Sequence, residues 1–305
     1  MAENCGTRGM GWLPDYPDFR DYTLKQATVA SKMKALGETS SVKAMLAKVG
    51  VVSPGKKALP PSVDLREWCS AIEDQGDIGS CTAHAGVGMV EYFARRAFGK
   101  HTDASRLFLY KVTRNVLHWT GDTGAFLRAT MGALTLFGVP PEEYWPYKAA
   151  DIDKEPPAFC YAFAQNYQAI SYFRLDSPGI TPAELVRQIK VNLAAGLPAM
   201  FGFTVYTSFS QAAGTGKIPC PADGEKTAGG HAVMAVGYDD AMKIENSGPK
   251  GPESKGAFII RNSWGTGWGA DGYGWLPYEY VLMGLAEDWW SLVKSEWIDT
   301  GAFKL

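Results

Sequence analysis

The spacing of apolar residues changes between the two halves of the chain, and this change restricts the fold classes open to it. In the first half, apolar side chains recur at helical spacing. These helical runs cover 81–98, 105–116 and 127–137. In the second half, short apolar or alternating runs lie between Gly, Pro and Asp, as is typical of strands. These strand runs cover 198–206, 231–239, 256–264 and 272–281. Helices followed by strands predict an α+β chain of two lobes.

Length and charge narrow the class of protein further. With 305 residues, 46% of them hydrophobic, the chain can build one large core or two lobes that share a cleft. The formal net charge is -2 and Lys and Arg are scattered, so we expect no nucleic-acid or membrane partner. No stretch approaches the ~20 consecutive apolar residues of a membrane span. The amino terminus has no basic region followed by an apolar run, so the sequence shows no signal peptide. A cytoplasmic location is the default expectation, and a secreted or vacuolar location is the alternative.

The five cysteines define neither a metal site nor a dense disulfide framework. Cys5, Cys69, Cys81, Cys160 and Cys220 lack metal-ligand spacing, so we expect no metal and no cofactor. Their odd number leaves at least one unpaired within the chain. The sequence does not decide whether the chain forms one or two disulfides.

The first 60 residues differ in amino-acid composition and patterning from the rest of the chain. Aromatic, Pro and Asp residues stud the stretch from Trp12 to Tyr22, and its prolines prevent a regular helix. A polar stretch over 27–48 predicts either a short helix or a connector. The punctuated segment SPGKKALPPS, residues 53–62, is typical of a linker. We therefore expect residues 1–60 to form an extension separate from the main domain.

Cys81 stands where a Gly- and Asp-rich loop, EDQGDIGSC (73–81), turns into a helical pattern. A helix amino terminus lowers the pKa of a thiol, because its free N–H groups and its dipole favour the thiolate. Gly76, Gly79 and Ser80 let backbone amides approach closely, which is also how an oxyanion site forms. Position alone leaves two interpretations open: a reactive nucleophile, or a cysteine buried for its packing.

A cysteine nucleophile needs a base, and the chain has four histidines. His84 lies three residues after Cys81 on the neighbouring face of the same predicted helix, so its ring is expected to line the wall. His101 and His118 have polar surroundings typical of solvated helix ends. His231 follows two glycines and opens the apolar strand of GGHAVMAVGYD, where a side chain can face a cleft. His231 is therefore the preferred base.

A catalytic imidazole also needs a third group that fixes its orientation. Asn262 ends the apolar strand of FIIRNSWGTGWG, with Trp264 and Trp268 able to cover it. A neutral amide orients an imidazolium without competing for its proton. The alternative is that Asn262 simply closes the strand with an Asx-type turn.

Taken together, these segments resemble the papain-like cysteine peptidases. QGDIGSC resembles the nucleophile loop of that family, with Gln75 six residues before Cys81, where the family keeps an oxyanion-hole glutamine. GGHAVMAVGYD resembles the histidine strand, RNSWGTGWGADGYG the asparagine motif, and PPSVDLREW the mature start. The resemblance runs from about Pro60 to about Leu285 in the same order.

The resemblance implies an α+β, papain-like two-lobed fold with the active site in the cleft between the lobes. It implies Cys81 as nucleophile, His231 as acid and base, Asn262 as the orienting residue, and Gln75 with the Cys81 amide as oxyanion donors. The substrates would be peptides or proteins.

It also implies a domain organisation. The peptidase domain would span 61–305. A helical first lobe would cover about 61–165, and a β-barrel-like second lobe would cover about 166–305.

The sequence departs from the family pattern around the nucleophile. The two cysteines that the family usually bridges correspond to Ile78 and Asp122, and the tryptophan after the nucleophile corresponds to Thr82. A substrate-binding glycine pair corresponds to Gly124 and Ala125. Both cysteines of the bridge are absent together, which indicates a branch of the family that lacks this disulfide. Backbone pairing to substrate survives, since any residue supplies N–H and C=O.

The sequence predicts the residues of the substrate pocket less directly than those of the triad. We place Trp264 among the substrate-binding residues, and the resemblance points to Asp288 or Glu287, in MGLAEDWWSL, as the floor of the second specificity pocket. An acid there would favour a basic side chain in the substrate. The alternative is a pair of solvated carboxylates at a surface turn.

These expectations combine into one hypothesis. The chain would be a cysteine endopeptidase made as a zymogen, with residues Met10 to Tyr22 of its own amino-terminal segment in the cleft. An oxidised form would carry a mixed disulfide between Cys5 and Cys81. The alternatives are an exopeptidase, with the carboxyl-terminal DTGAFKL blocking one end of the cleft, and a non-catalytic binding protein on the same scaffold.

Overall fold

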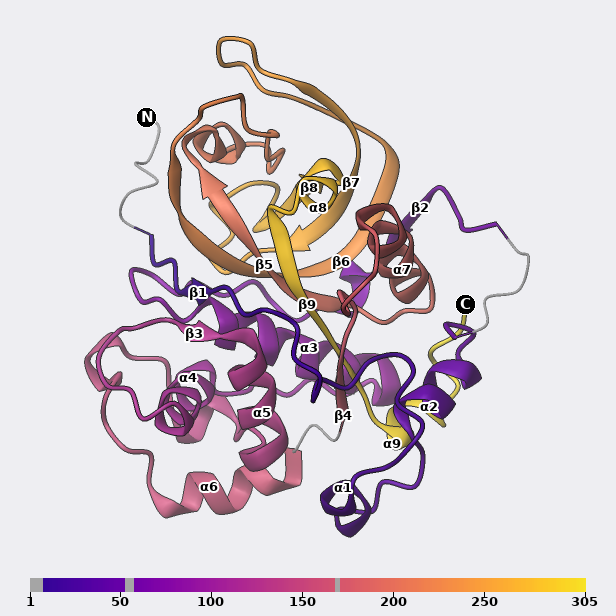
Figure 1. Ribbon diagram of the computed structural model, residues 1–305. Helices are drawn as coiled ribbons and strands as arrows, with labels where there is room; N and C mark the ends of the chain where they lie inside the picture. Colours follow the sequence, from indigo (N-terminus) through magenta and orange to yellow (C-terminus); the bar gives the residue numbers. More distant parts are fainter. Residues whose placement is uncertain (1–7, 53–57, 168–170) are drawn as a thin grey trace.

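The computed structural model describes residues 8–52, 58–167 and 171–305. It divides into a helical lobe and a lobe built on one sheet (Figure 1). The helices are α1 (Ser31–Ala35), α2 (Val42–Lys48), α3 (Cys81–Phe98), α4 (Arg106–Val116), α5 (Leu127–Phe137), α6 (Ala158–Ala164), α7 (Pro182–Ala194), α8 (Glu279–Leu282) and α9 (Ser295–Ile298). The strands are β1 (Trp12–Leu13), β2 (Ser62–Asp64), β3 (Ala125–Phe126), β4 (Ser171–Arg174), β5 (Ala199–Tyr206), β6 (Thr227–Glu245), β7 (Glu253–Arg261), β8 (Tyr273–Pro277) and β9 (Ala286–Val293).

The three helices predicted in the first half form the helical lobe as α3, α4 and α5. Helix α3 is buried from Cys81 to Phe93 and ends at Phe98. Gly99 follows in a left-handed conformation, which suits a residue without a side chain. Helix α4 begins after Ser105, whose hydroxyl accepts a hydrogen bond from the Phe108 amide. Because α3 packs against α4, α5 and strand β6, it is the central element that both lobes share.

The second lobe is a seven-stranded sheet. Its strand order is β4-β9-β5-β6-β7-β8, with β2 added to β6. The sheet curls strongly (Figure 1), but within the described ranges β8 does not pair with β4, so the barrel-like lobe is an open sheet. The strand predicted over 272–281 is too long: β8 ends at Pro277 and a helical turn, α8, follows. Proline lacks the N–H that would continue the ladder.

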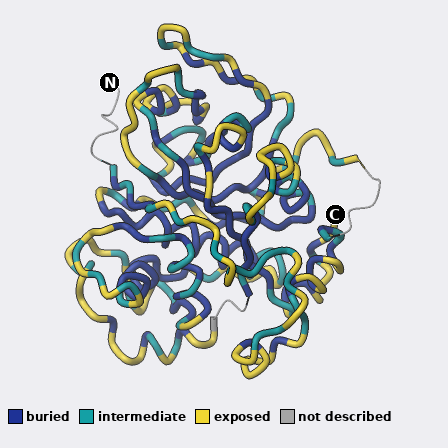
Figure 2. Tube along the Cα trace, viewed as in Figure 1, coloured by how far each residue is buried: buried dark blue, intermediate teal, exposed yellow. Residues whose placement is uncertain are grey.

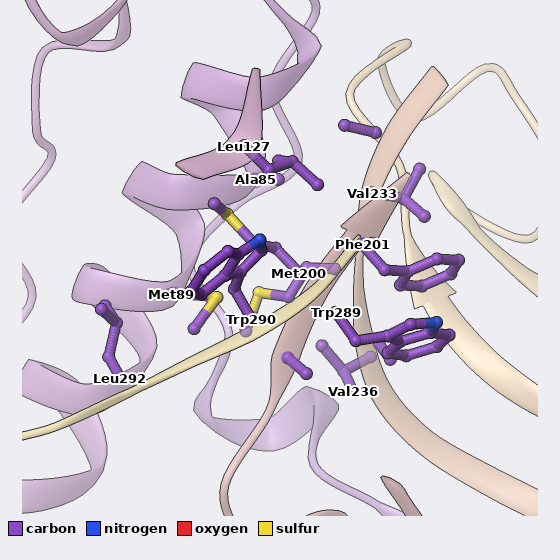
Figure 3. Close-up of a cluster of buried hydrophobic side chains, with 14 of the residues drawn as sticks. Ala85, Met89, Leu127, Met200, Phe201, Val233, Val236, Trp289, Trp290 and Leu292 are labelled. Carbon is purple, nitrogen blue, oxygen red and sulfur yellow. The ribbon is translucent and has the colours of Figure 1, made fainter. Parts of the chain in front are cut away.

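The lobes meet across a core of large, fully buried side chains. Met89 of α3 lies beside Met200 of β5 and Trp290 of β9 (Figure 3). To one side of them, the Phe201 and Trp289 rings stack with centroids 3.9 Å apart. All five side chains are fully buried. Large-to-small substitutions in such a core typically cost ~2–5 kcal/mol of folding stability. The helix that carries Cys81 is therefore held firmly against the sheet that carries His231.

The amino-terminal segment lies across the junction of the two lobes. Its strand β1 pairs in parallel with β3, with Trp12 opposite Ala125. Within residues 8–22, burial is confined to Gly9, Gly11 and Trp12 (Figure 2): Trp12 is 6% exposed, whereas Tyr16 and Phe19 are 83% and 93% exposed. The stretch predicted over 27–48 as a short helix or a connector forms α1 and α2, and the Ser41 hydroxyl caps α2.

Two arginines hold the next part of that segment. Arg128 of α5 donates to the carboxylates of Asp15 and Asp21. Arg174 of β4 donates through its side chain to the Asp15 carbonyl oxygen at 2.8 Å and through its backbone to the Tyr22 carbonyl oxygen at 2.7 Å. Residues 15–22 are thus fixed to both lobes by charged and backbone hydrogen bonds.

The carboxyl-terminal residues pack at the far end of α3. Trp297 of α9 stacks on Phe93 with ring centroids 4.8 Å apart, and Arg96 donates to the Ala302 carbonyl oxygen at 3.1 Å. Phe93 is twelve residues after Cys81, which places it about 18 Å along the helix axis. The tail is therefore anchored away from the first turn of α3.

Candidate active site

The Cys81 thiol is fully buried at the first residue of α3. Burial raises its pKa to about 11, while hydrogen bonds from the backbone of Ala232, Gly11 and Thr82 lower it in part. These contacts place the sulfur between the histidine strand β6 and the amino-terminal segment. With that segment in place the thiol is protonated at neutral pH.

His231 and Asn262 are brought together by the sheet. Nε2 of His231 lies 2.8 Å from Oδ1 of Asn262. Burial lowers the pKa of His231 to about 4, against a smaller opposing effect of the Asn262 hydrogen bond. Within the described residues the other ring nitrogen, Nδ1, has no hydrogen-bond partner. His231 directly precedes Ala232, whose backbone reaches the Cys81 sulfur, so Nδ1 is the ring nitrogen free to exchange a proton.

Trp264 covers this pair from one side. Its indole ring lies 4.8 Å from the His231 ring, centroid to centroid, and it is 2% exposed. Trp268 packs edge-on against Trp264 and stacks on Phe209. The tryptophans thus shield the imidazole from solvent, and Trp264 contacts the His231 ring itself.

Gln75 occupies the loop before α3 and is 1% exposed. Its Oε1 accepts from the Ser263 hydroxyl at 2.5 Å. Its Nε2 donates to the carbonyl oxygens of Gly9, at 2.9 Å, and Ile78, at 2.7 Å. The side chain is therefore held by the residue next to Asn262, and its amide donor is already directed at a carbonyl group of the amino-terminal segment.

The remaining histidines lie outside this arrangement. Nδ1 of His84 is 3.2 Å from the Ser80 hydroxyl and from the Ser80 carbonyl oxygen. The His84 ring packs edge-on against Tyr147, and burial lowers its pKa to about 3. His101 and His118 are exposed. These placements match the wall and solvated positions expected for them.

Gly124 and Ala125 form the edge on which the amino-terminal segment rests. The Ala125 amide donates to the Gly11 carbonyl oxygen at 2.8 Å. Gly124 has a φ of 71°, and a Cβ there would lie 2.3 Å from the same oxygen. Only glycine permits this approach at position 124. Position 125 contributes its backbone amide, so an alanine there leaves the edge intact.

Asp288 is not at a solvated surface turn. It is fully buried, whereas its neighbour Glu287 is exposed. Its carboxylate lies 3.3 Å from the Arg174 guanidinium and accepts from the indole N–H groups of Trp290, at 2.7 Å, and Trp12, at 3.3 Å. Burial raises its pKa to about 7, and Arg174 opposes this rise. The solvated interpretation was wrong because strand β9 turns this side chain inward.

Asp122 ties the nucleophile loop to the segment-binding edge. Its carboxylate accepts from the Gly79 amide at 2.9 and 3.0 Å and from the Tyr110 hydroxyl at 2.6 Å. The Tyr110 oxygen in turn accepts from the Gly124 amide at 3.0 Å. This connection stands where the resemblance implies a disulfide. The sequence marked Asp122 only as a missing cysteine and gave no signal for Tyr110.

Among the residues that the structure describes, the free thiols are those of Cys69, Cys81, Cys160 and Cys220. The expected mixed disulfide involves Cys5, which lies outside the described residues. In the described part of the chain, no group of three or more His, Cys, Asp or Glu side chains could hold a metal ion. No helix there is both long and apolar enough to cross a membrane.

The fold and the clustered Cys, His, Asn and Gln side chains define a class of protein. The family profile described as papain family cysteine protease matches residues 59–288. The chain belongs to this family and is a cysteine-type peptidase, a hydrolase, with the two-lobed α+β fold predicted from the sequence.

Particular relatives sharpen the comparison. The chain is 32% identical to an uncharacterized peptidase C1-like protein of Acanthamoeba polyphaga mimivirus, over 95% of this chain and 88% of the other. It is similar in structure to xylellain, a cysteine protease from Xylella fastidiosa, with a TM-score of 0.71 and 32% identity over 96% of this chain and 98% of the other. Bromelain from Ananas comosus shares the fold, with a TM-score of 0.57 and 20% identity over 78% of this chain and 100% of the other.

Proposed function

We propose that the protein is a cysteine endopeptidase with the triad Cys81, His231 and Asn262, held inactive by its own amino-terminal segment. The observation that carries the triad is the 2.8 Å contact between Nε2 of His231 and Oδ1 of Asn262. This contact leaves Nδ1 of His231 without another partner among the described residues, next to the backbone that reaches the Cys81 sulfur.

The proposed reaction proceeds in two steps. The Cys81 thiolate attacks the peptide carbonyl carbon, and the imidazolium of His231 gives its proton to the leaving amine as the C–N bond breaks. His231 then takes a proton from water, whose oxygen attacks the thioester carbon; the C–S bond breaks, the acid leaves, and the pair of Cys81 thiolate and His231 imidazolium is restored. Gln75 and the Cys81 amide donate to the developing oxyanion, each worth about 3 kcal/mol in the transition state.

The amino-terminal segment has the alternation of an extended strand that suits the cleft. A Cβ on Gly9 or Gly11 would lie 2.1 Å or 1.8 Å from backbone oxygens of residues 78 and 79, so these two positions face the nucleophile loop. Met10 and Trp12 face the other way, toward glycines of β5 and β6. This fit supports Gly9–Leu13 as the inhibitory stretch within residues 1–60.

The orientation of Gly11 explains why the segment would not be cleaved there. The Gly11 backbone donates toward the Cys81 sulfur and lowers its pKa, whereas the Gly11 carbonyl oxygen accepts from Ala125 at 2.8 Å. The Gly9 carbonyl oxygen accepts from Gln75. The nucleophile therefore meets an N–H group and not a carbonyl carbon.

Endopeptidase activity is favoured over exopeptidase activity by the course of the tail. The carboxyl-terminal DTGAFKL, residues 299–305, packs near Phe93 and Arg96, with Phe303 buried against Phe93. These positions lie about 18 Å or more along α3 from Cys81. The tail is thus remote from the site that an exopeptidase loop would obstruct.

The pH dependence of Cys81 alkylation tests the proposal. In the full chain we expect slow labelling by iodoacetamide that accelerates only as pH rises toward the thiol pKa of about 11. In a Gly11→Ala chain the added methyl cannot fit against Gly79, the segment leaves, and Cys81 pairs with His231 as thiolate and imidazolium. Mass spectrometry should then find stoichiometric labelling of Cys81 at pH 5.5, with Cys220 unlabelled. Equal reactivity of the two cysteines in this variant would contradict the proposal.

Asp122 provides a separate prediction about the nucleophile loop. Asp122→Ala leaves the buried Gly79 amide without its carboxylate partner, so the free energy of unfolding should fall by about 1–2 kcal/mol. We expect kcat/KM of the Gly11→Ala chain to fall several-fold as well, because Gly79 lies two residues before the nucleophile. Asp122→Asn keeps one acceptor and should lose less. Asp77→Ala, an exposed carboxylate of the same loop, serves as the control, and an equal loss there would refute a specific role for Asp122.

A further inference from the structure

We infer that the pocket holding the Trp12 side chain selects peptides with an aromatic side chain that carries a hydrogen-bond donor, tryptophan above all, and disfavours cationic side chains. This inference rests on the proposed function, because it takes the segment as the stand-in for a substrate. Asp288 is the specificity-determining residue, and Arg174 sets its charge.

The shape of the pocket fits a large flat ring. A Cβ on Gly202 of β5 would lie 1.9 Å from Cε2 of Trp12, and a Cβ on Gly230 of β6 would lie 2.9 Å from its Cε3. Two strands therefore carry glycine where the indole lies. The ring is covered well enough that Trp12 is only 6% exposed. A β-branched or short aliphatic side chain would leave part of this space empty.

The chemistry at the end of the pocket fits a donor. Asp288 accepts from the indole N–H of Trp12 at 3.3 Å through one oxygen and from the indole N–H of Trp290 at 2.7 Å through the other. The Trp290 contact is internal to β9 and persists when the segment leaves. One carboxylate oxygen then faces the pocket with a lone pair to satisfy, and a ring without a donor would leave this oxygen unpaired.

The Arg174 guanidinium already balances the charge of Asp288. The Arg174 guanidinium lies 3.3 Å from the Asp288 carboxylate and is 1% exposed. It also lies over the Trp290 ring, 5.1 Å from the centroid. A lysine or arginine side chain entering the pocket would approach a second buried cation across a carboxylate that is already paired, and it would lose its hydration as well. An acidic residue alone would lead us to expect a preference for basic substrate side chains. The pairing of Asp288 with Arg174 therefore disfavours that preference.

The first experiment measures substrate preference in the full chain carrying Trp12→Ala, which empties the pocket. Four fluorogenic dipeptide substrates share one residue at the cleavage site and carry Trp, Phe, Leu or Arg before it. We expect kcat/KM for Trp to exceed that for Phe by about 10-fold, as for a hydrogen bond to a charged acceptor. The Arg substrate should be the poorest. An Arg substrate equal to or better than the Trp substrate would overturn the inference.

The second experiment separates the pocket from the catalytic proposal. In a full chain carrying Cys81→Ala and Trp12→Ala, fluorescence anisotropy reports the binding of labelled copies of GMGWLPDY with Trp, Phe or Arg at the fourth position. Tighter binding of the Trp peptide supports the pocket even if no substrate is hydrolysed, in which case only the proposed function fails. Equal binding of the three peptides overturns the inference whatever the activity.

Asp288→Asn, made in the same chains, tests the specific contact. A neutral amide is a weaker acceptor, so the preference for Trp over Phe should shrink to about 2- to 3-fold in both assays. Glu287→Gln changes the exposed neighbouring carboxylate and should leave the preference unchanged. Circular dichroism confirms that each variant is folded before the ratios are compared. An unaltered ratio in folded Asp288→Asn would exclude Asp288 as the determinant.

Discussion

Cys81→Ala is expected to abolish peptide hydrolysis, with a loss of at least ~10⁴-fold in kcat/KM, because no other group supplies the attacking sulfur. The measurement is best made in the Trp12→Ala chain, where the segment does not limit access. His231→Ala should produce a loss of similar size. Combining it with Cys81→Ala should cost almost nothing more, since the two residues act as one unit in forming the acyl-enzyme. Asn262→Ala should cost less, about 10- to 100-fold, because it only orients the imidazole.

Cys160→Ala is the matched control for this series. Cys160 is also buried and free, but it lies on α6, away from the triad. Its loss should leave kcat/KM within about twofold. Retention of activity in the Cys81→Ala chain would refute the triad, whereas an equal fall in the Cys160→Ala chain would point to general destabilisation.

Trp12→Ala is expected to release the amino-terminal segment and activate the full chain. Truncating a buried tryptophan typically costs about 3–5 kcal/mol, which would shift the equilibrium between bound and released segment by roughly 10²- to 5 × 10³-fold. Hydrolysis of a fluorogenic peptide should rise accordingly, up to the limit at which the segment is fully displaced. Gly11→Ala should activate by a different route, because its methyl would meet the Gly79 carbonyl group at 1.8 Å.

Phe19→Ala is the matched control in the same segment. Phe19 is an aromatic residue 93% exposed to solvent, and its loss should leave activity unchanged. If Trp12→Ala and Gly11→Ala both fold and neither is more active than the unmodified chain, self-inhibition by Gly9–Leu13 is wrong. Activation by Phe19→Ala to the same level would show that the segment obstructs the site non-specifically and not through the contacts of Gly9–Leu13 in the cleft.

Much of the helical lobe follows from local spacing. The helix predicted over 81–98 is α3 to the residue, because apolar periodicity, the loop before it and Gly99 all agree. The strand predicted over 272–281 failed at its end, since its apolar residues continue into α8 while Pro277 stops the ladder. Periodicity alone does not distinguish a short buried helix from the end of a strand.

Family membership can be predicted from the amino-acid sequence alone, because Cys81, His231 and Asn262 each stand in a motif with characteristic residue types and order. The surroundings of these residues depend instead on long-range packing. The pairing of Asp288 with Arg174, and the bridge through Asp122 from the nucleophile loop to Gly124, join residues far apart in the chain. No local propensity encodes such contacts. They exist because the open sheet and α3 pack in one arrangement, which brings each carboxylate to its partner.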